Sequence, residues 1–242
     1  MMRERRLTIH FQPIVAAKNP GGDVFAYECL LRGLDTDGGL GNPEIMFEGA
    51  EGAGLLFNLD RDARTTAIRR AAEHGIESNI FINFNPTSIY DPVYCLRSTM
   101  KAFEETNLRT EQVVFEITEG QRVKDTRHLL NIIDYYRDAG FRIALDDLGA
   151  GYSSLNLLSK LKPDFVKLDI ELVRDVGVDP YKTQVAAKIL EMANGLGVGV
   201  VAEGVETEEE WRWLGEHGAD YVQGYLFARP TSPPPLPAKL SI

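Results

Sequence analysis

Residues 165–203 read FVKLDIELVRDVGVDPYKTQVAAKILEMANGLGVGVVAE, and this segment has the pattern of a strand–helix–strand unit, which decides the fold class. Two short runs rich in β-branched and apolar residues, Phe165–Asp169 and Val198–Glu203, have the length and composition of buried strands. Between them, apolar residues recur three and four positions apart, as at Val185 and Ile189, which is the spacing of one helix face. A strand, a helix and a second strand in this order predict parallel strands joined by a crossover.

The same alternation extends over the rest of the chain. The strands that it predicts are Ile9–Val15, Val24–Leu30, Ile80–Phe84, Val113–Ile117, Arg142–Asp146, Phe165–Asp169, Val198–Glu203 and Asp220–Gln223. Eight strands in a chain of 242 residues predict closure into a TIM-like (β/α)8 barrel of the α/β class. The first joint differs, because residues 19–23, NPGGD, form a tight turn with no room for a helix. We therefore expect a modified barrel whose first strand pair is antiparallel.

The length suits one domain that covers residues 1–242. The barrel is expected from about residue 7 to residue 230, and residues 231–242 form a proline-rich C-terminal tail. A helix start is predicted at Asn42-Pro43, where a capping residue precedes proline at the first helical position. The acids Glu208 to Glu210 open another helix, where we expect them to be a solvated cap.

The composition indicates which kinds of partner the chain can bind and in which cell compartment we expect it. Lys and Arg number 26 against 36 Asp and Glu, a formal net charge of -10, which opposes binding to nucleic-acid backbones. A small anionic ligand is compatible with this charge if a metal ion supplies positive charge locally. Cys29 and Cys95 fit no metal spacing and are expected to be reduced thiols. No signal peptide or membrane-spanning stretch is evident, so we expect a cytoplasmic domain without membrane contact, which could be part of a longer protein.

Polar residues recur where the predicted strands end. They are Glu28, Asn83, Glu116, Asp146, Asp147, Lys167, Asp169, Glu203 and Gln223. In a parallel barrel the carboxyl ends of the strands meet on one face, where enzymes of this architecture place their active sites. An isolated acid here would be explained by a salt bridge, but so many acids at one mouth predict a functional site.

The ligand types indicate the chemistry. Carboxylates with an amide oxygen and no cysteine or strand-end histidine suit Mg²⁺ or Mn²⁺. So many acids need more than one divalent ion, and Asp146 could bridge two ions while Asp147 serves the second. Such a pair suits phosphoryl displacement, with Lys167 polarising the water or neutralising charge in the transition state. Magnesium-dependent enolisation uses a similar set of residues, and spacing alone leaves it open.

Eight local strings, read whole, resemble the EAL family of cyclic di-GMP phosphodiesterases from about Phe11 to Pro230. In chain order they are FQPI at 11–14, YECLLR at 27–32, FIN at 81–83, FEITE at 115–119, DDLGAGYSS at 146–154, VKLD at 166–169, AEGVET at 202–207 and QGY at 223–225. The resemblance implies hydrolysis of cyclic di-GMP to linear pGpG with two Mg²⁺ or Mn²⁺ ions. It also implies that the domain pairs as a homodimer. Ca²⁺ makes longer and looser bonds, so we expect it to inhibit. In a longer protein, a regulatory or sensor domain could accompany this one.

The resemblance also assigns roles. Glu28, Asn83, Glu116 and Asp146 match ligands of a first metal, with Asp146 shared and Asp147 on the second. Glu203 matches a ligand or water-orienting acid. Lys167, Glu203 and Asp147 are therefore the expected catalytic residues. The positions that match substrate contacts are Gln12, Arg32, Gln223 and Glu206, with Arg32 at a phosphate oxygen. Glu206 and Glu119 also match positions that support the site and its loop.

Three departures from the family pattern stand out. The signature Glu-Ala-Leu is Glu28-Cys29-Leu30 here, with the middle side chain expected to point away from the metals. Residues 33–37, GLDTD, replace a tryptophan and a His-Pro pair. Leu148 and Ala150 replace phenylalanine and threonine in the loop after the fifth strand, and we expect Ala150 to loosen that loop. A catalytically silent cyclic di-GMP receptor is the alternative function, although every metal position and the lysine are retained.

Overall fold

A computed structural model of the chain describes residues 6–19, 21–35, 37–86, 89, 91–118, 126–149 and 154–238. The strands are β1 (Leu7–Ala16), β2 (Val24–Leu34), β3 (Leu40–Gly41), β4 (Asn79–Asn83), β5 (Val113–Thr118), β6 (Arg142–Leu148), β7 (Phe165–Leu168), β8 (Gly199–Ala202) and β9 (Tyr221–Val222). The α-helices are α1 (Pro43–Gly52), α2 (Leu56–Glu73), α3 (Pro92–Glu104), α4 (Thr126–Asp138), α5 (Ser154–Leu161), α6 (Ile170–Val173), α7 (Pro180–Leu196) and α8 (Glu208–Glu216), with a 3₁₀ turn at Thr110–Gln112.

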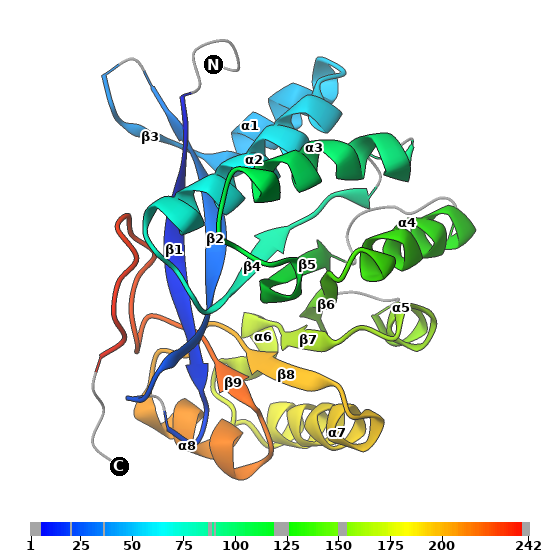
Figure 1. Ribbon diagram of the computed structural model, residues 1–242. Coiled ribbons are helices and arrows are strands. Elements are labelled where there is room, and N and C mark those ends of the chain that lie inside the picture. Colours follow the sequence, from blue (N-terminus) through cyan, green and yellow to red (C-terminus); the bar gives the residue numbers. More distant parts are fainter. Residues whose placement is uncertain are drawn as a thin grey trace.

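The strands close into a barrel (Figure 1). Their order is β1-β9-β8-β7-β6-β5-β4-β2, and β1 pairs with β2 to complete the ring. The strand β1 is antiparallel to both of its neighbours, β2 and β9. Every other neighbouring pair in the ring, from β2–β4 to β8–β9, is parallel. The predicted barrel, its eight strands and its antiparallel first pair are therefore confirmed.

Several strand ends differ from the prediction by one or two residues, and the end of β2 differs by four. The strand β2 was expected to end at Leu30 but continues to Leu34, because Gly33 still pairs with Leu7 of β1 and with Gly41 of β3. The short strand β3 was not predicted. Together β2 and β3 form a hairpin that projects beyond the ring (Figure 1).

Local capping chemistry explains where several helices begin. Asn42 accepts a hydrogen bond from the Glu44 amide at the start of α1, as predicted, and Pro43 occupies the first turn. Asp91 before Pro92 and Asp179 before Pro180 repeat this arrangement at α3 and α7. Each cap satisfies backbone donors that have no partner within the helix.

The expectation that Glu208 to Glu210 form a solvated cap is wrong for Glu210. This side chain is only 4% exposed. Its carboxylate accepts from the amides of Glu206 and Thr207 at 3.0 and 3.2 Å, and from the Asp175 amide at 3.2 Å. The capping box with Thr207 turns Glu210 inward, so it joins the loop after β8 to the segment after α6.

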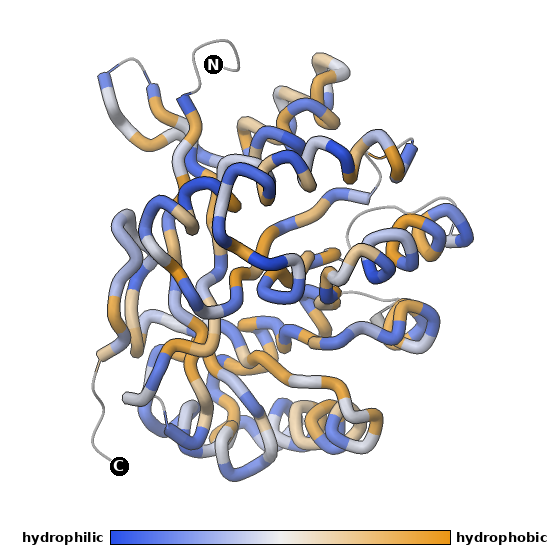
Figure 2. Tube along the Cα trace, viewed as in Figure 1, coloured by the Kyte–Doolittle hydropathy of each residue, from blue (hydrophilic) through white to orange (hydrophobic). Residues whose placement is uncertain are grey.

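The described residues form two hydrophobic cores that support the barrel. The larger one fills the space between the strands and the surrounding helices, and α4 contributes Leu129, Ile132, Ile133 and Tyr136 to it. Along α4 and α7, hydrophobic and hydrophilic residues alternate, as expected for helices with one buried face (Figure 2). The smaller core fills the inside of the barrel and consists of Ile14, Ala26, Phe81, Val114, Ala144, Phe165 and Val201.

The proline-rich segment lies along the barrel as far as it is described. Thr231 exchanges backbone hydrogen bonds of 2.8 and 3.1 Å with Phe11, and the Tyr27 hydroxyl donates to the carbonyl of Pro235 at 3.0 Å. Both cysteines are free and buried. Every helix among the described residues is too short or too polar to span a lipid bilayer.

Candidate functional site

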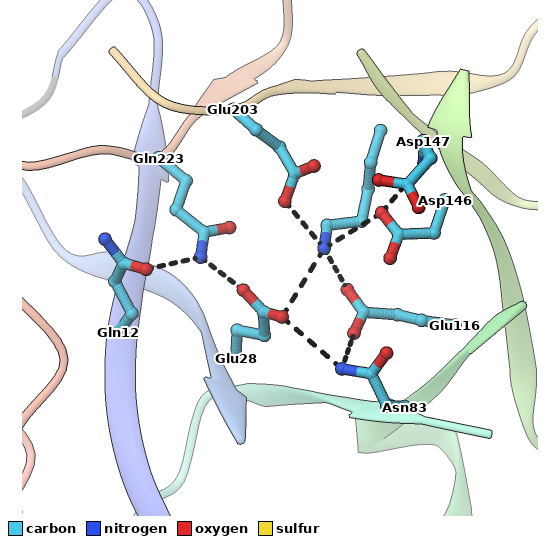
Figure 3. Close-up of polar contacts among 9 residues, drawn as sticks. Gln12, Glu28, Asn83, Glu116, Asp146, Asp147, Glu203 and Gln223 are labelled. Carbon is cyan, nitrogen blue, oxygen red and sulfur yellow. Dashed lines mark hydrogen bonds and ion pairs between the residues drawn. The ribbon is translucent and has the colours of Figure 1, made fainter. Parts of the chain in front are cut away.

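A layer of polar side chains lies inside the barrel, near the carboxyl ends of its parallel strands (Figure 3). Each barrel strand, or the residue directly after it, contributes one member: Gln12, Glu28, Asn83, Glu116, Asp146, Lys167, Glu203 and Gln223. Each member is two positions along its strand from a residue of the inner core or a residue packed on it. Because alternate residues of a strand face the same way, the polar layer lies directly above the apolar one.

Lys167 is the centre of this layer. Its Nζ lies 2.6 Å from Glu116 Oε1, 2.7 Å from Glu203 Oε1, 3.3 Å from Asp146 Oδ1 and 3.6 Å from Glu28 Oε1. The side chain is 1% exposed. Burial by itself lowers the pKa of Lys167, but the surrounding carboxylates outweigh burial and raise that pKa well above its ordinary value. The ammonium group therefore stays charged at neutral pH.

Amide side chains hold the carboxylates from the other side. Gln223 Nε2 donates to Glu28 Oε2 at 2.5 Å and to Gln12 Oε1 at 3.1 Å. Asn83 Nδ2 donates to Glu116 Oε2 at 3.2 Å and to Glu28 Oε1 at 3.5 Å. The amide oxygen of Asn83 is then the atom available to ligate a cation. Cys29 packs in the outer core, on the opposite face of β2, as expected for the middle residue of its motif.

The adjacent acids Asp146 and Asp147 both face the site because β6 is irregular there. Neighbouring residues of a regular strand point to opposite faces. The register with β7 shifts between Leu145 and Leu148, and Asp147 has a φ of 57°, in the left-handed region. One carboxylate oxygen each of Asp146, Asp147 and Glu203 lies within 4.8 Å of the others, close enough for a shared cation. The sequence showed the adjacent pair, and the bulge is what makes both acids usable.

The charges of the cluster fit divalent cations. Burial raises the pKa of Glu116 well above its usual range and that of Glu203 to about 8. Burial, with the neighbouring Asp146 charge, raises the pKa of Asp147 to about 6. Five carboxylates face one ammonium group, and the excess negative charge needs protons or cations nearby. An all-oxygen donor set of this kind suits Mg²⁺ or Mn²⁺.

A cavity of about 700 Å³ opens beside the acids. Asn83, Asp146 and Asp147 line it on one side, and Arg32 lines it on the β2 side. Asp60 of α2 also lines the cavity and was not predicted from the sequence. One sequence signal could have identified Asp60. It lies at the helical spacing of the buried apolar residues of α2 and four residues before Arg64, and both charged side chains are buried.

Not every predicted residue joins the cluster. Glu206 is exposed and pairs with Arg174 of the α6 end, at 2.8 Å between Oε2 and Nη1. Glu119 and Ala150 lie outside the described residues, so the expectations for them, including a looser loop at Ala150, stay predictions.

Comparison with known proteins places this geometry in a family. The EAL domain model matches residues 1–230. The cyclic di-GMP phosphodiesterase PdeR of Escherichia coli is 30% identical over 228 residues, which cover 93% of this chain and 34% of PdeR. This chain therefore spans about a third of the length of that curated relative.

Two solved structures have the same fold. BlrP1 of Klebsiella pneumoniae, in complex with manganese and cyclic di-GMP, superposes with a TM-score of 0.84 at 34% identity, over 93% of this chain and 56% of that one. A standalone EAL protein of Vibrio cholerae, bound to cyclic di-GMP, superposes with a TM-score of 0.85 at 34% identity, over 96% of this chain and 95% of that one. The chain belongs to the EAL domain family.

Proposed function

We propose that this chain is a metal-dependent phosphodiesterase that hydrolyses cyclic di-GMP to linear pGpG. The observation that carries the proposal is the ring of carboxylates around Lys167, open to a cavity that Arg32 also lines. The phosphodiesterase activity of the relative PdeR and the cyclic di-GMP bound to two structural neighbours support the choice of substrate.

The proposed cofactor is a pair of Mg²⁺ or Mn²⁺ ions. Glu28, Asn83, Glu116 and Asp146 would hold the first ion, Asp146 and Asp147 the second, and Glu203 would ligate at the pair. When bound, such ions supply Lewis acidity to the attacking water and to the phosphate oxygens. The manganese in the BlrP1 complex supports this choice of metal.

The chain's own residues have distinct roles in this proposal. Water attacks one phosphorus atom and the P–O3′ bond of that phosphodiester breaks, so the single linear product carries both a 5′-phosphate and a 3′-hydroxyl group. The attacking water loses one proton to a carboxylate, and the departing O3′ takes up one proton from solvent. Glu203 and Asp147 orient the water and accept its proton, and Lys167 stabilises the negative charge that grows on the phosphate oxygens. Gln223 donates to Glu28 and holds it in place, while Gln12 accepts from Gln223. In the proposal, both glutamines also contact the substrate.

Further expectations concern assembly. We propose that the domain works as a homodimer within a protein that also carries a regulatory or sensor domain, and that Glu206 supports the substrate side of the site through its loop. Nucleic acid is not a proposed partner, because the net charge is -10.

One assay tests the activity. The protein is incubated with cyclic di-GMP and Mn²⁺, Mg²⁺ or Ca²⁺, and the products are separated by chromatography. We expect pGpG with Mn²⁺ or Mg²⁺, none after chelation, and binding without hydrolysis in Ca²⁺, whose bonds are longer and looser. Binding in all metals without any product would select the silent receptor. If the protein neither binds nor hydrolyses cyclic di-GMP, the enolising alternative is reopened.

Arg32→Ala separates substrate binding from chemistry. We expect KM to rise by about ten- to a hundred-fold with little change in kcat, because a charge-assisted contact to a phosphate oxygen is lost in ground and transition states alike. Arg69→Ala, which removes an exposed arginine paired with Glu105, is the matched control. Steady-state kinetics of the three proteins decides; a fall in kcat at constant KM would move Arg32 into the catalytic step.

A further inference from the structure

The helix α2 carries an arginine that is wholly buried. Arg64 is 0% exposed, and its Nη1 pairs with Oδ2 of Asp60, one turn earlier. Its Nε and Nη2 are also buried, and no hydrogen bond to them occurs among the described residues. Taking a guanidinium group out of water in this way is costly, and a buried ion pair is often no better for stability than apolar side chains of the same size. Stability alone therefore does not account for the pair, and its contacts indicate a positional role.

The pair is connected to the carboxylate layer through the segment after β4. Oδ1 of Asp60 accepts the backbone N–H of Asn85 at 3.0 Å. The Arg64 guanidinium carbon lies 5.2 Å from the centre of the Phe84 ring, and Phe84 is 1% exposed. Both contacts therefore hold the two residues that come directly after Asn83.

Asn83 is the last residue of β4, where it pairs with Glu116 of β5 and the Phe84 N–H donates to the Glu116 carbonyl at 2.9 Å. The ladder ends there, so the path of Phe84 and Asn85 helps to fix the orientation of Asn83. Its Nδ2 reaches Glu116 and Glu28 from this position. A change of about 1 Å in the backbone at residues 84 and 85 would move the amide oxygen out of ligating distance, since metal–oxygen bonds tolerate only a few tenths of an ångström.

We propose that Arg64 is a positioning residue for the metal site. It fixes the Asp60 carboxylate against the Asn85 amide and packs on Phe84, and together these contacts set where Asn83 presents its oxygen. Groups behind the ligands commonly control metal affinity in this way. The inference rests on the proposed metal-dependent function and adds a residue outside the cavity wall to it.

Metal binding tests the proposal without reference to turnover. Mn²⁺ affinity is measured by isothermal titration calorimetry on metal-free protein, at a temperature where thermal melts show each variant to be folded. We expect Arg64→Met to bind Mn²⁺ about ten-fold more weakly than the wild type. Arg69→Met, on the exposed side of the same helix, is the matched control and should bind like the wild type.

A double-mutant cycle shows whether the effect passes through Asn83. In an Asn83→Ala background, Arg64→Met should change Mn²⁺ affinity by less than about two-fold, because the ligand that it positions is already absent. Hydrogen exchange of the Asn85 amide is the second readout, and it should be faster in Arg64→Met. A ten-fold loss that persists in the Asn83→Ala background would overturn the proposal, as would wild-type affinity in Arg64→Met.

Arg64→Lys is the substitute if Arg64→Met does not fold. It keeps the charge opposite Asp60 but loses the planar group on Phe84, so we expect about three-fold weaker Mn²⁺ binding. Wild-type affinity and wild-type Asn85 exchange in this variant would overturn the role given to the guanidinium group. A wild-type protein that binds no Mn²⁺ would remove the proposed function as well, whereas normal wild-type binding with no effect at Arg64 removes this inference alone.

Discussion

Asp146→Asn is expected to lower kcat for cyclic di-GMP hydrolysis by roughly a thousand-fold or more, with the barrel still folded. In the proposed function this carboxylate would help to hold both cations, so one substitution would weaken the binding of both. Asp146 also lies in a crowded negative cluster, where its Oδ1 is 3.3 Å from Lys167 Nζ. Lys167 keeps its shorter contacts to Glu116 and Glu203, so loss of the Asp146 charge should leave the stability of the metal-free protein unchanged or slightly raised.

The measurement combines kinetics over a range of Mn²⁺ concentrations with thermal unfolding in a chelator. Asp134→Asn makes the same chemical change at an exposed position of α4 and should behave like the wild type. Near wild-type turnover in Asp146→Asn would show that the shared-ligand assignment is wrong. Restoration of full activity by excess Mn²⁺ would confine the role of Asp146 to affinity.

Lys167→Met is expected to lower kcat by about a hundred- to a thousand-fold with little change in KM. Methionine fills most of the same volume, so the packing around the side chain is largely kept while the charge is removed. Lys167 is in contact with four carboxylates, and removing its charge leaves the cluster more negative. Mn²⁺ affinity should therefore stay the same or increase while turnover falls.

A fall in turnover without a fall in Mn²⁺ affinity would distinguish a catalytic role of Lys167 from a purely structural one. If Lys167 only held the carboxylates in place, Lys167→Met would lose metal affinity and turnover together. Calorimetry with Mn²⁺ and steady-state kinetics on the same preparation separate the two outcomes. Lys188→Met, at an exposed lysine of α7 that pairs with Glu191, is the control for loss of one positive charge.

Much of the fold could be predicted because its signals are local. Alternation of short β-branched runs with helical spacing identified all eight barrel strands, and the turn at residues 19–23 predicted the antiparallel first pair. Capping chemistry gave the start of α1 at Asn42 and Pro43. The candidate site followed from topology, because parallel strands in a closed barrel must bring their carboxyl ends to one face. This placed Asn83, Glu116, Lys167, Glu203 and Gln223 directly, whereas Glu28 lies within β2, which continues to Leu34.

Side-chain direction and helix-borne contacts required the tertiary structure. Asp147 faces the site because β6 is irregular there and the φ of Asp147 is 57°. No sequence pattern at residues 145–148 predicts that irregularity. Glu210 resembles any other surface acid at a helix start, yet its carboxylate is buried and accepts from the backbone amide of Glu206 and, in a second segment, from that of Asp175. Glu206 shares a motif with Glu203 but turns outward to Arg174.

The sequence by itself determined the barrel, its antiparallel first pair and most of the polar residues near the carboxyl ends of its parallel strands, since these depend on periodicity and turn chemistry between near neighbours. Tertiary structure alone decided that Lys167 lies among four carboxylates and that Arg64 stands behind Asn83. The physical reason is that burial and charge pairing depend on groups far apart in the chain. A buried lysine such as Lys167 is tolerated where several carboxylates converge on it, and the fold sets that convergence.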